Sequence, residues 1–269
     1  MSPFEQALIL GVVQGLTEFL PISGDGHLAL AQLLLDVDNG GLTLSVLLHA
    51  GTLLATVLYF RQRLAKVLLD LGKHLGRGRL PAPSSAGWDA VLVLLAALPT
   101  GLIGLALHDT VVGWTRQPLA TGFGFVVTAC LLTSTLWTKP GALSSPSLPG
   151  ALLLGLAQGL AVAPGVSRSG ITIVAALWLG LRAERAFELS MLMSVPAVSA
   201  AIALELVAGD SMAGHALAIG AGVLTSFAVG YVGLRLLRRV VLAGSIAWFS
   251  LWVLPLALAT LALAKAWPS

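Results

Sequence analysis

The sequence predicts an all-α polytopic membrane protein with about six transmembrane helices and two opposed re-entrant helix-loop-helix hairpins. Hydrophobic residues make up 57% of the 269 residues and charged residues 10%, with a mean hydropathy of +0.93. Soluble domains carry about 25% charged residues. Apolar segments of roughly 20 residues recur along the chain, which is the length that crosses a hydrocarbon core about 30 Å thick. These segments must be helical because lipid offers the backbone no hydrogen-bond partners.

A short polar motif occurs twice inside otherwise apolar sequence. Each copy has Gln-Gly-Leu followed by a proline, a serine and a glycine, and the copies span residues 14–26 and 158–170. Their first glutamines are 144 residues apart (158 minus 14). In membrane proteins such a repeat predicts homologous halves that place broken helices around a shared site near the midplane. We therefore expect one integral membrane domain over residues 1–269, built from inverted halves of about 1–140 and 141–269.

The distribution of basic residues predicts the topology. Six of the fifteen Lys and Arg residues lie between positions 61 and 79 with one acid among them, so this loop is expected in the cytoplasm. The remaining basic clusters also fall inside when the chain crosses the membrane at residues 42–60, 88–107, 119–137, 186–207, 217–234 and 244–264. Segments 5–35 and 147–181 then dip into the membrane from opposite faces and return. Both contain Pro and Gly at mid-segment, and non-helical backbone at that depth is tolerated only beside a cavity or inside protein, so the two tips are expected to meet.

Beyond Glu5 at the start of the first dip, the two dips contain four ionisable residues, Glu18, Asp25, His27 and Arg168. An ionisable residue at membrane depth costs about 2.5–3.5 kcal/mol on insertion scales, so such residues are rare and usually functional. The planar fork of Arg168 suits phosphate oxygens, and backbone N–H groups at a helix start add to the grip. The alternative interpretation is a structural ion pair between Arg168 and Glu18 that holds the hairpins together, and both roles are compatible. The predicted anion clamp consists of Arg168 and its neighbours Ser167, Ser169, Gly170 and Thr172.

The first copy of the motif supplies candidate acid and base groups. His27 opens a helix, a position suited to proton transfer or to nucleophilic attack on a bound ligand, although a lone histidine is often only a hydrogen-bonded polar residue. Gln14 lies four residues before Glu18 and shares a helix face with it, so the pair can orient a metal, a water or a hydroxyl. The alternative role for Gln14 is a hydrogen bond between helices.

Several other residues are expected to be structural or interfacial. His49 can face the cavity from the first span, but a structural or interfacial role is expected for it. The single cysteine, Cys130, lies in an apolar run and is expected to be a small buried hydrophobe. Small residues at 220–222 and at Gly230 permit close helix packing, either within one chain or in a homodimer. The remaining structural or interfacial candidates are His108 with Asp109, Glu205 and His215.

The two motifs resemble those of the undecaprenyl-pyrophosphate phosphatase family, also called the bacitracin-resistance family. The resemblance rests on residues 14–23, on Gly26-His27-Leu28 and on residues 164–172, and the hydrophobic layout agrees from end to end. It implies a multi-pass enzyme of the bacterial inner membrane, with its active site opening to the periplasm. That enzyme removes the terminal phosphate of a C55 isoprenyl pyrophosphate and so recycles the lipid carrier for cell-wall synthesis. The implied partners are this lipid and the bilayer, with no nucleic acid, and the implied cofactor is a divalent cation, Mg²⁺ or Ca²⁺.

The resemblance also assigns roles to residues. Glu18 and Gln14 match the family's acidic element, and His27 matches its histidine. Arg168 matches the arginine taken to hold the pyrophosphate, supported by Ser167, Ser169 and Thr172.

One departure from the family pattern concerns the nucleophile. The family usually has two successive serines, whereas this chain has Ser23 followed by Gly24, so the serine that one mechanism makes the nucleophile is missing. The attacking group is then Ser23, His27 or a water activated by a carboxylate or a metal. Asp25, with Glu18, can hold a metal or accept the proton of the water.

Two rival functions remain open at this stage. Inverted repeats with opposed broken helices are also a transporter architecture, so the chain can be a flippase for the lipid monophosphate. Alternatively it binds the lipid pyrophosphate with weakened catalysis, because Gly24 replaces the usual serine. Phosphate release in detergent distinguishes these functions, because detergent leaves no bilayer across which transport could be measured.

Overall fold

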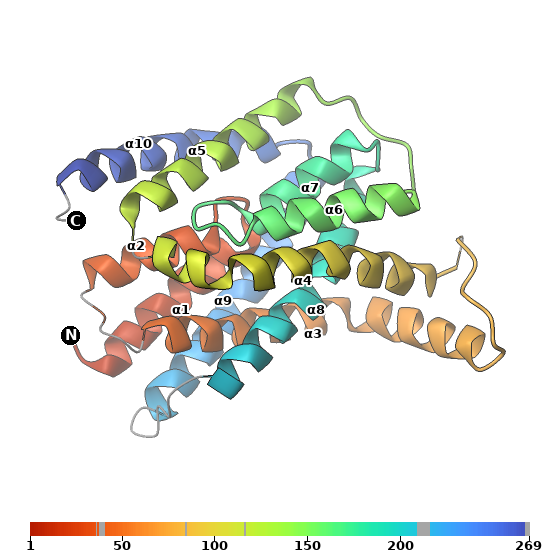
Figure 1. Ribbon diagram of the computed structural model, residues 1–269, viewed down its shortest axis with the longest axis horizontal. Helices are drawn as coiled ribbons and strands as arrows, with labels where there is room; N and C mark the ends of the chain where they lie inside the picture. The colour runs from red at the N-terminus through yellow and green to blue at the C-terminus, as the bar shows by residue number, and fades with distance from the viewer. Residues whose placement is uncertain (36, 38–40, 84, 116, 209–215, 267–269) are drawn as a thin grey trace.

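The computed structural model describes residues 1–35, 37, 41–83, 85–115, 117–208 and 216–266, and most of this part of the chain is helical (Figure 1). It contains ten α-helices and two short 3-10 helices, with no β-strand among the described residues. The elements in chain order are α1 (Pro3–Phe19), α2 (Gly24–Leu34), α3 (Gly41–Leu75), α4 (Trp88–Thr115), α5 (Pro118–Ser134), η1 (Thr135–Trp137), α6 (Leu148–Leu160), α7 (Arg168–Trp178), α8 (Ala183–Ala208), α9 (Ala216–Leu242), η2 (Ile246–Phe249) and α10 (Ser250–Ala266).

Six of the described helical segments are long and apolar enough to cross a membrane. They are α3, α4, α5 with η1, α8, α9, and η2 with α10, which confirms the six predicted spans. The basic segment 61–79, predicted as a loop, is largely helical, because α3 continues to Leu75. Lys and Arg are good helix formers, so a basic run marks the membrane boundary and not the end of the helix.

The two predicted dips are helical hairpins of shorter helices, α1 with α2 and α6 with α7. Figure 1 shows the N-terminus and the end of α10 at one end of the molecule, and the end of α3 with the start of α4 at the other. The hairpin tips meet, as predicted: the Ser169 hydroxyl donates to the Leu20 carbonyl at 3.5 Å. A Cβ atom on Gly26 would lie 2.9 Å from Gly165 Cα, so the two tip backbones are in close contact.

The helix contacts are consistent with the predicted inverted repeat. If α1–α5 correspond to α6–α10, the packing of α1 against α9 is equivalent to the packing of α6 against α4, and both are observed. The packing of α5 against α10 and of α3 against α8 joins corresponding helices of the two halves. Each hairpin is therefore held mainly by a span of the opposite half.

Glycine allows the closest helix contacts around α9. A Cβ atom on Gly51 of α3 would lie 2.0 Å from Ser226 Oγ and 2.3 Å from the Val223 carbonyl oxygen. Gly222 likewise faces Ala7 of α1 and Leu48 of α3. Gly230 faces Phe19 of α1 and Thr52 of α3. Lipid provides no hydrophobic drive between helices, so this close backbone approach is how they associate. Gly222 and Gly230 are thus used within the chain, whereas no described atom lies within 4 Å of a Cβ built at Gly220.

The remaining residues predicted to be structural or interfacial differ in how exposed they are. The prediction that Cys130 is buried was wrong, because its side chain is exposed on α5. An apolar run looks the same whether it faces lipid or protein, so hydrophobicity alone does not give burial. His108 is exposed and lies 3.2 Å from the Asp109 carboxylate, consistent with an interfacial role. His215 and the side chain of Glu205 lie outside the described residues.

We predict that Gly51→Ala destabilises the protein by about 1–3 kcal/mol or more, because the added methyl meets backbone and hydroxyl oxygens of α9. Gly101→Ala is the matched control, since no atom lies within 4 Å of a Cβ built at Gly101 in α4. Melting temperatures in detergent measure both effects. Equal melting temperatures for the two variants would show that the α3–α9 contact is looser than described.

Candidate functional site

The candidate site is centred on an ion pair between the two hairpin tips. Arg168 Nη2, at the first residue of α7, donates to Glu18 Oε1 near the end of α1. The two side chains are only 16% and 8% exposed. Arg168 Nη1 is buried and has no hydrogen-bond partner among the described atoms. The predicted structural pair is therefore present, and one donor of the same guanidinium remains for an anion.

In both motif copies a serine N-cap starts the helix at the hairpin tip. The Ser23 hydroxyl accepts from Gly26 N at 3.3 Å and caps α2, and the Ser167 hydroxyl accepts from Gly170 N at 3.1 Å and caps α7. Serine is a preferred cap because its oxygen satisfies an N–H group that has no partner in the helix. Ser23 is also the only described non-glycine residue with positive φ, at 70°. These caps place Asp25 and Arg168 in the first turns of their helices.

His49 joins Glu18 and Asp25 into one cluster. Its Nε2 lies 3.2 Å from Asp25 Oδ1 and 3.4 Å from Glu18 Oε2. Gln14 Nε2 donates to the same Glu18 oxygen at 3.0 Å, as its spacing on the helix predicted. Sequence reasoning underrated His49, although an ionisable residue inside a predicted span is itself a signal of function.

The other members of the predicted anion clamp support the turn that carries Arg168. Ser167, Ser169 and Thr172 are buried. Thr172 Oγ1 donates to the Arg168 carbonyl at 2.8 Å and lies 2.6 Å from Ser190 Oγ. A Cβ atom on Gly170 would lie 3.0 Å from Ser167 Oγ, so a larger residue there would crowd the cap.

His27 lies apart from the carboxylates. Its Nδ1 is 2.8 Å from the Ser23 carbonyl oxygen, which can only accept, so Nδ1 carries a hydrogen. Its Nε2 accepts from the indole N–H of Trp252 in α10 at 3.0 Å. The ring also packs edge-on against Phe125 at 5.3 Å between centroids. Both ring nitrogens are thus engaged, and no described interaction joins His27 to Glu18, Asp25 or Arg168.

The donor set for the predicted divalent cation is small. Among the described residues, no group of three or more His, Cys, Asp and Glu side chains is arranged to hold a metal ion. One Glu18 oxygen faces Arg168, and the other faces Gln14 and His49. The Asp25 side chain is 53% exposed and keeps one oxygen available. The residues therefore fit a cation only if substrate oxygens complete its coordination, as is common for Mg²⁺.

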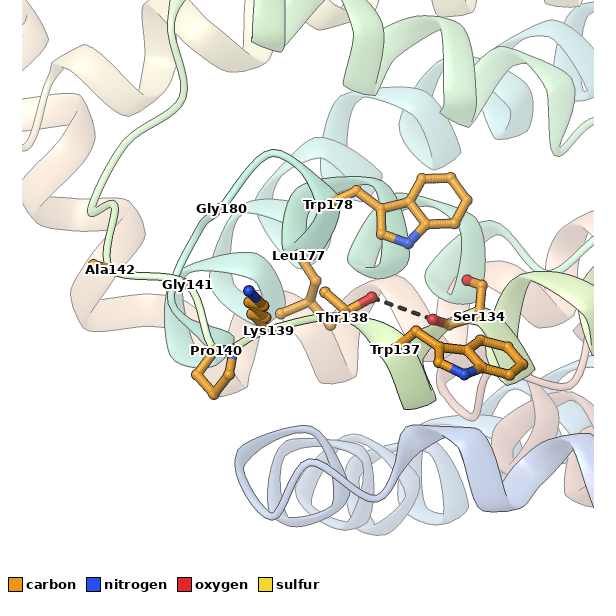
Figure 2. Close-up of a pocket in the computed structure, with 10 residues that line it drawn as sticks. All are labelled: Ser134, Trp137, Thr138, Lys139, Pro140, Gly141, Ala142, Leu177, Trp178 and Gly180. Carbon is orange, nitrogen blue, oxygen red and sulfur yellow. Dashed lines mark hydrogen bonds between the residues drawn. The ribbon is translucent and has the colours of Figure 1, made fainter.

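Two surface cavities lie away from these residues. The larger, of about 580 Å³, lies between η1 and the end of α7 (Figure 2). Trp137, Trp178 and Lys139 line it, a combination typical of a membrane interface. The smaller, of about 380 Å³, surrounds the buried Asp89, which pairs with Arg63 at 2.5 Å and with Arg185 at 2.7 Å. Neither cavity is lined by a residue of the candidate site.

Six spanning helices and two opposed hairpins whose tips pair an arginine with a buried glutamate define a polytopic integral membrane protein with broken helices at its centre. The family model described as bacitracin resistance protein BacA matches residues 7–259, and the chain belongs to this family. An undecaprenyl-diphosphatase of Treponema denticola is 37% identical over 261 residues, covering 96% of each chain. One of Rubrobacter xylanophilus is 42% identical, covering 86% of this chain and 87% of the relative. One of Korarchaeum cryptofilum is 36% identical, covering 96% and 98%.

We predict that Thr172→Val destabilises the protein by about 1–3 kcal/mol, because it removes the hydroxyl contacts to the Arg168 and Ser169 carbonyls and leaves the buried Ser190 hydroxyl without that partner. Thr172→Ser keeps the hydroxyl and should retain the wild-type melting temperature. If Thr172 contacted substrate directly instead, Thr172→Val would raise KM and leave the melting temperature unchanged.

Proposed function

We propose that this protein hydrolyses undecaprenyl pyrophosphate to undecaprenyl phosphate and inorganic phosphate, and so recycles the lipid carrier. The observation that carries the proposal is the buried Arg168 Nη1, a free donor of a guanidinium whose other end is held by Glu18. The family match and the names of the three relatives support this substrate. A free guanidinium donor at membrane depth is suited to the headgroup of a lipid that carries pyrophosphate.

In this proposal Arg168 and the first turn of α7 hold the pyrophosphate. The guanidinium donor and the N–H groups at the helix start face the charge that develops on the phosphoryl oxygens. Phosphoryl transfer needs little covalent help from the protein, so positioning and charge stabilisation are the main catalytic devices. Ser167, Ser169 and Thr172 contribute by keeping Arg168 in place, as their buried hydrogen bonds suggest.

Water is the nucleophile that the geometry supports best. The Ser23 hydroxyl is buried in the α2 cap, and His27 Nε2 is engaged by Trp252. Asp25 Oδ2 has no described partner and is free to accept a proton. The water oxygen bonds to the terminal phosphorus while the bond from that phosphorus to the bridging oxygen breaks. The electron pair of that bond stays on the lipid phosphate, and the proton of the water passes to Asp25.

A divalent cation, where bound, would be held by Asp25, with its coordination completed by substrate oxygens. When bound it would neutralise phosphate charge beside Arg168. Glu18 then serves to orient Arg168, because both of its oxygens already have partners.

We place the protein in the bacterial inner membrane with the site open to the periplasm. The support is the charge distribution: the basic end of α3 and the loop that follows it are expected in the cytoplasm, and the α1–α2 hairpin then enters from the opposite face. A flippase remains the rival function, but the three relatives are named for hydrolysis.

Phosphate release from C55 pyrophosphate by the purified protein in detergent tests the function. We expect release that depends on a divalent cation and that falls at least 10²-fold in Arg168→Ala, because the donor to the developing charge is lost. Arg168→Lys should restore little of this release, since a single ammonium lacks the planar, two-sided set of donors with which the guanidinium binds Glu18 and phosphate together. Near-normal release by Arg168→Ala would contradict the site, and lipid binding without release by the wild type would favour a carrier.

Restoring the usual serine tests the choice of nucleophile. We predict that Gly24→Ser does not raise the turnover number and lowers it instead, because its Cβ would lie 3.2 Å from Glu18 Cα and 3.3 Å from Glu18 Oε2. Steady-state phosphate release measures the effect. A rise above the wild-type rate would point to attack by serine and away from water.

A further inference from the structure

We propose that His49 is a positioning residue for Asp25, holding that carboxylate in the orientation in which it accepts the proton of the attacking water. The inference rests on the proposed function and adds a residue from α3 to a site otherwise built from the two hairpin tips. It concerns geometry at one carboxylate and requires no additional chemical step.

The His49 ring is fixed at both nitrogens. Nδ1 lies 2.8 Å from the Ser45 carbonyl oxygen one turn earlier on α3, and that oxygen can only accept. This contact sets the orientation of the ring and directs Nε2 away from its own helix. Nε2 then meets Asp25 Oδ1 at 3.2 Å and Glu18 Oε2 at 3.4 Å. The side chain is only 17% exposed, so little water competes for these contacts.

The backbone that carries His49 is held equally firmly. The Ser226 hydroxyl of α9 donates to the Leu48 carbonyl at 2.7 Å, and Thr52 Oγ1 donates to the His49 carbonyl at 3.0 Å. Gly51, two residues after His49, brings α3 against α9. The position of Nε2 is therefore set by the packing of two spanning helices and does not depend on the hairpin.

Asp25 needs such an anchor more than the other site residues. It lies in the first turn of the short helix α2 between Gly24 and Gly26, and its side chain is 53% exposed. His49 supplies its one described ion pair. With Oδ1 held by His49, Oδ2 has a defined direction for a bound water. A misplacement of about 1 Å in a reacting group can cost about 10²-fold in rate, so this contact affects turnover more than binding.

A double-mutant cycle tests whether His49 acts through Asp25. His49→Leu is expected to lower kcat of phosphate release about 10–100-fold with KM changed less than about twofold. His49→Gln, which keeps an N–H donor near the Nε2 position, should recover most of the loss at an unchanged melting temperature. Asp25→Asn should lower kcat by itself, and adding His49→Leu to Asp25→Asn should cause no further loss.

His74 provides a matched control on the same helix. Its Nδ1 also lies 2.8 Å from a carbonyl one turn earlier, that of Asp70, and 3.5 Å from the Asp70 carboxylate, but it is remote from the hairpin tips. His74→Leu should leave kcat and KM unchanged.

Three results would overturn the inference. With an active wild type, a normal kcat in His49→Leu would overturn this inference and leave the proposed function standing. Losses of kcat that multiply in the double variant would do the same, and so would a loss in His49→Leu that His49→Gln does not recover. Absence of phosphate release by the wild type would overturn the proposed function, and this inference with it.

Discussion

The ion pair between Glu18 and Arg168 is the interaction on which the rest of the structure depends. Each charge comes from a different half of the chain and lies at a hairpin tip where little water reaches it. Removing one partner of a buried pair typically costs about 3–5 kcal/mol, because the other charge is left uncompensated. The hairpins must therefore meet, and the caps at Ser23 and Ser167 and the close contacts of α9 are the means by which they do so.

The cost of leaving a buried polar group unpaired also determines which side chains of the site remain available to bind substrate. Buried hydroxyls near the tips are engaged within the protein, since an unpaired polar group at this depth is costly. The buried polar atoms there without a described partner are Arg168 Nη1 and the amide oxygens of Gln14 and Gln158. The two motif glutamines have diverged accordingly: Gln14 binds Glu18, whereas Gln158 contacts Thr100 Oγ1 at 3.4 Å and the Met193 carbonyl at 3.5 Å. One copy of the repeat thus carries the acidic cluster and the other carries Arg168. The candidate site is therefore asymmetric, although the helix contacts of the two halves correspond.

Much of this arrangement followed from the sequence, because its causes are local or compositional. Hydropathy, basic residues and mid-segment Pro and Gly gave the six spans and the two hairpins, and the cost of buried charge gave the pairing of Glu18 with Arg168. The exposure of Cys130 and the contacts of His49 did not follow. Both depend on which face of a uniformly apolar helix meets protein, and helix rotation is set by tertiary packing that hydropathy does not record.

The departure of this chain from the usual family motif is best understood as a single structural change over two adjacent residues. With no side chain at position 24, α2 begins directly against the Glu18 backbone, where a Cβ would be only 3.2 Å from Glu18 Cα and N. That close approach brings the next residue, Asp25, within 3.2 Å of His49 on α3. The loss of one hydroxyl and the gain of an anchored carboxylate are therefore linked. In the proposed mechanism, a water held by Asp25 takes the place of a serine oxygen, so the reacting polar group lies at residue 25 of α2 instead of residue 24.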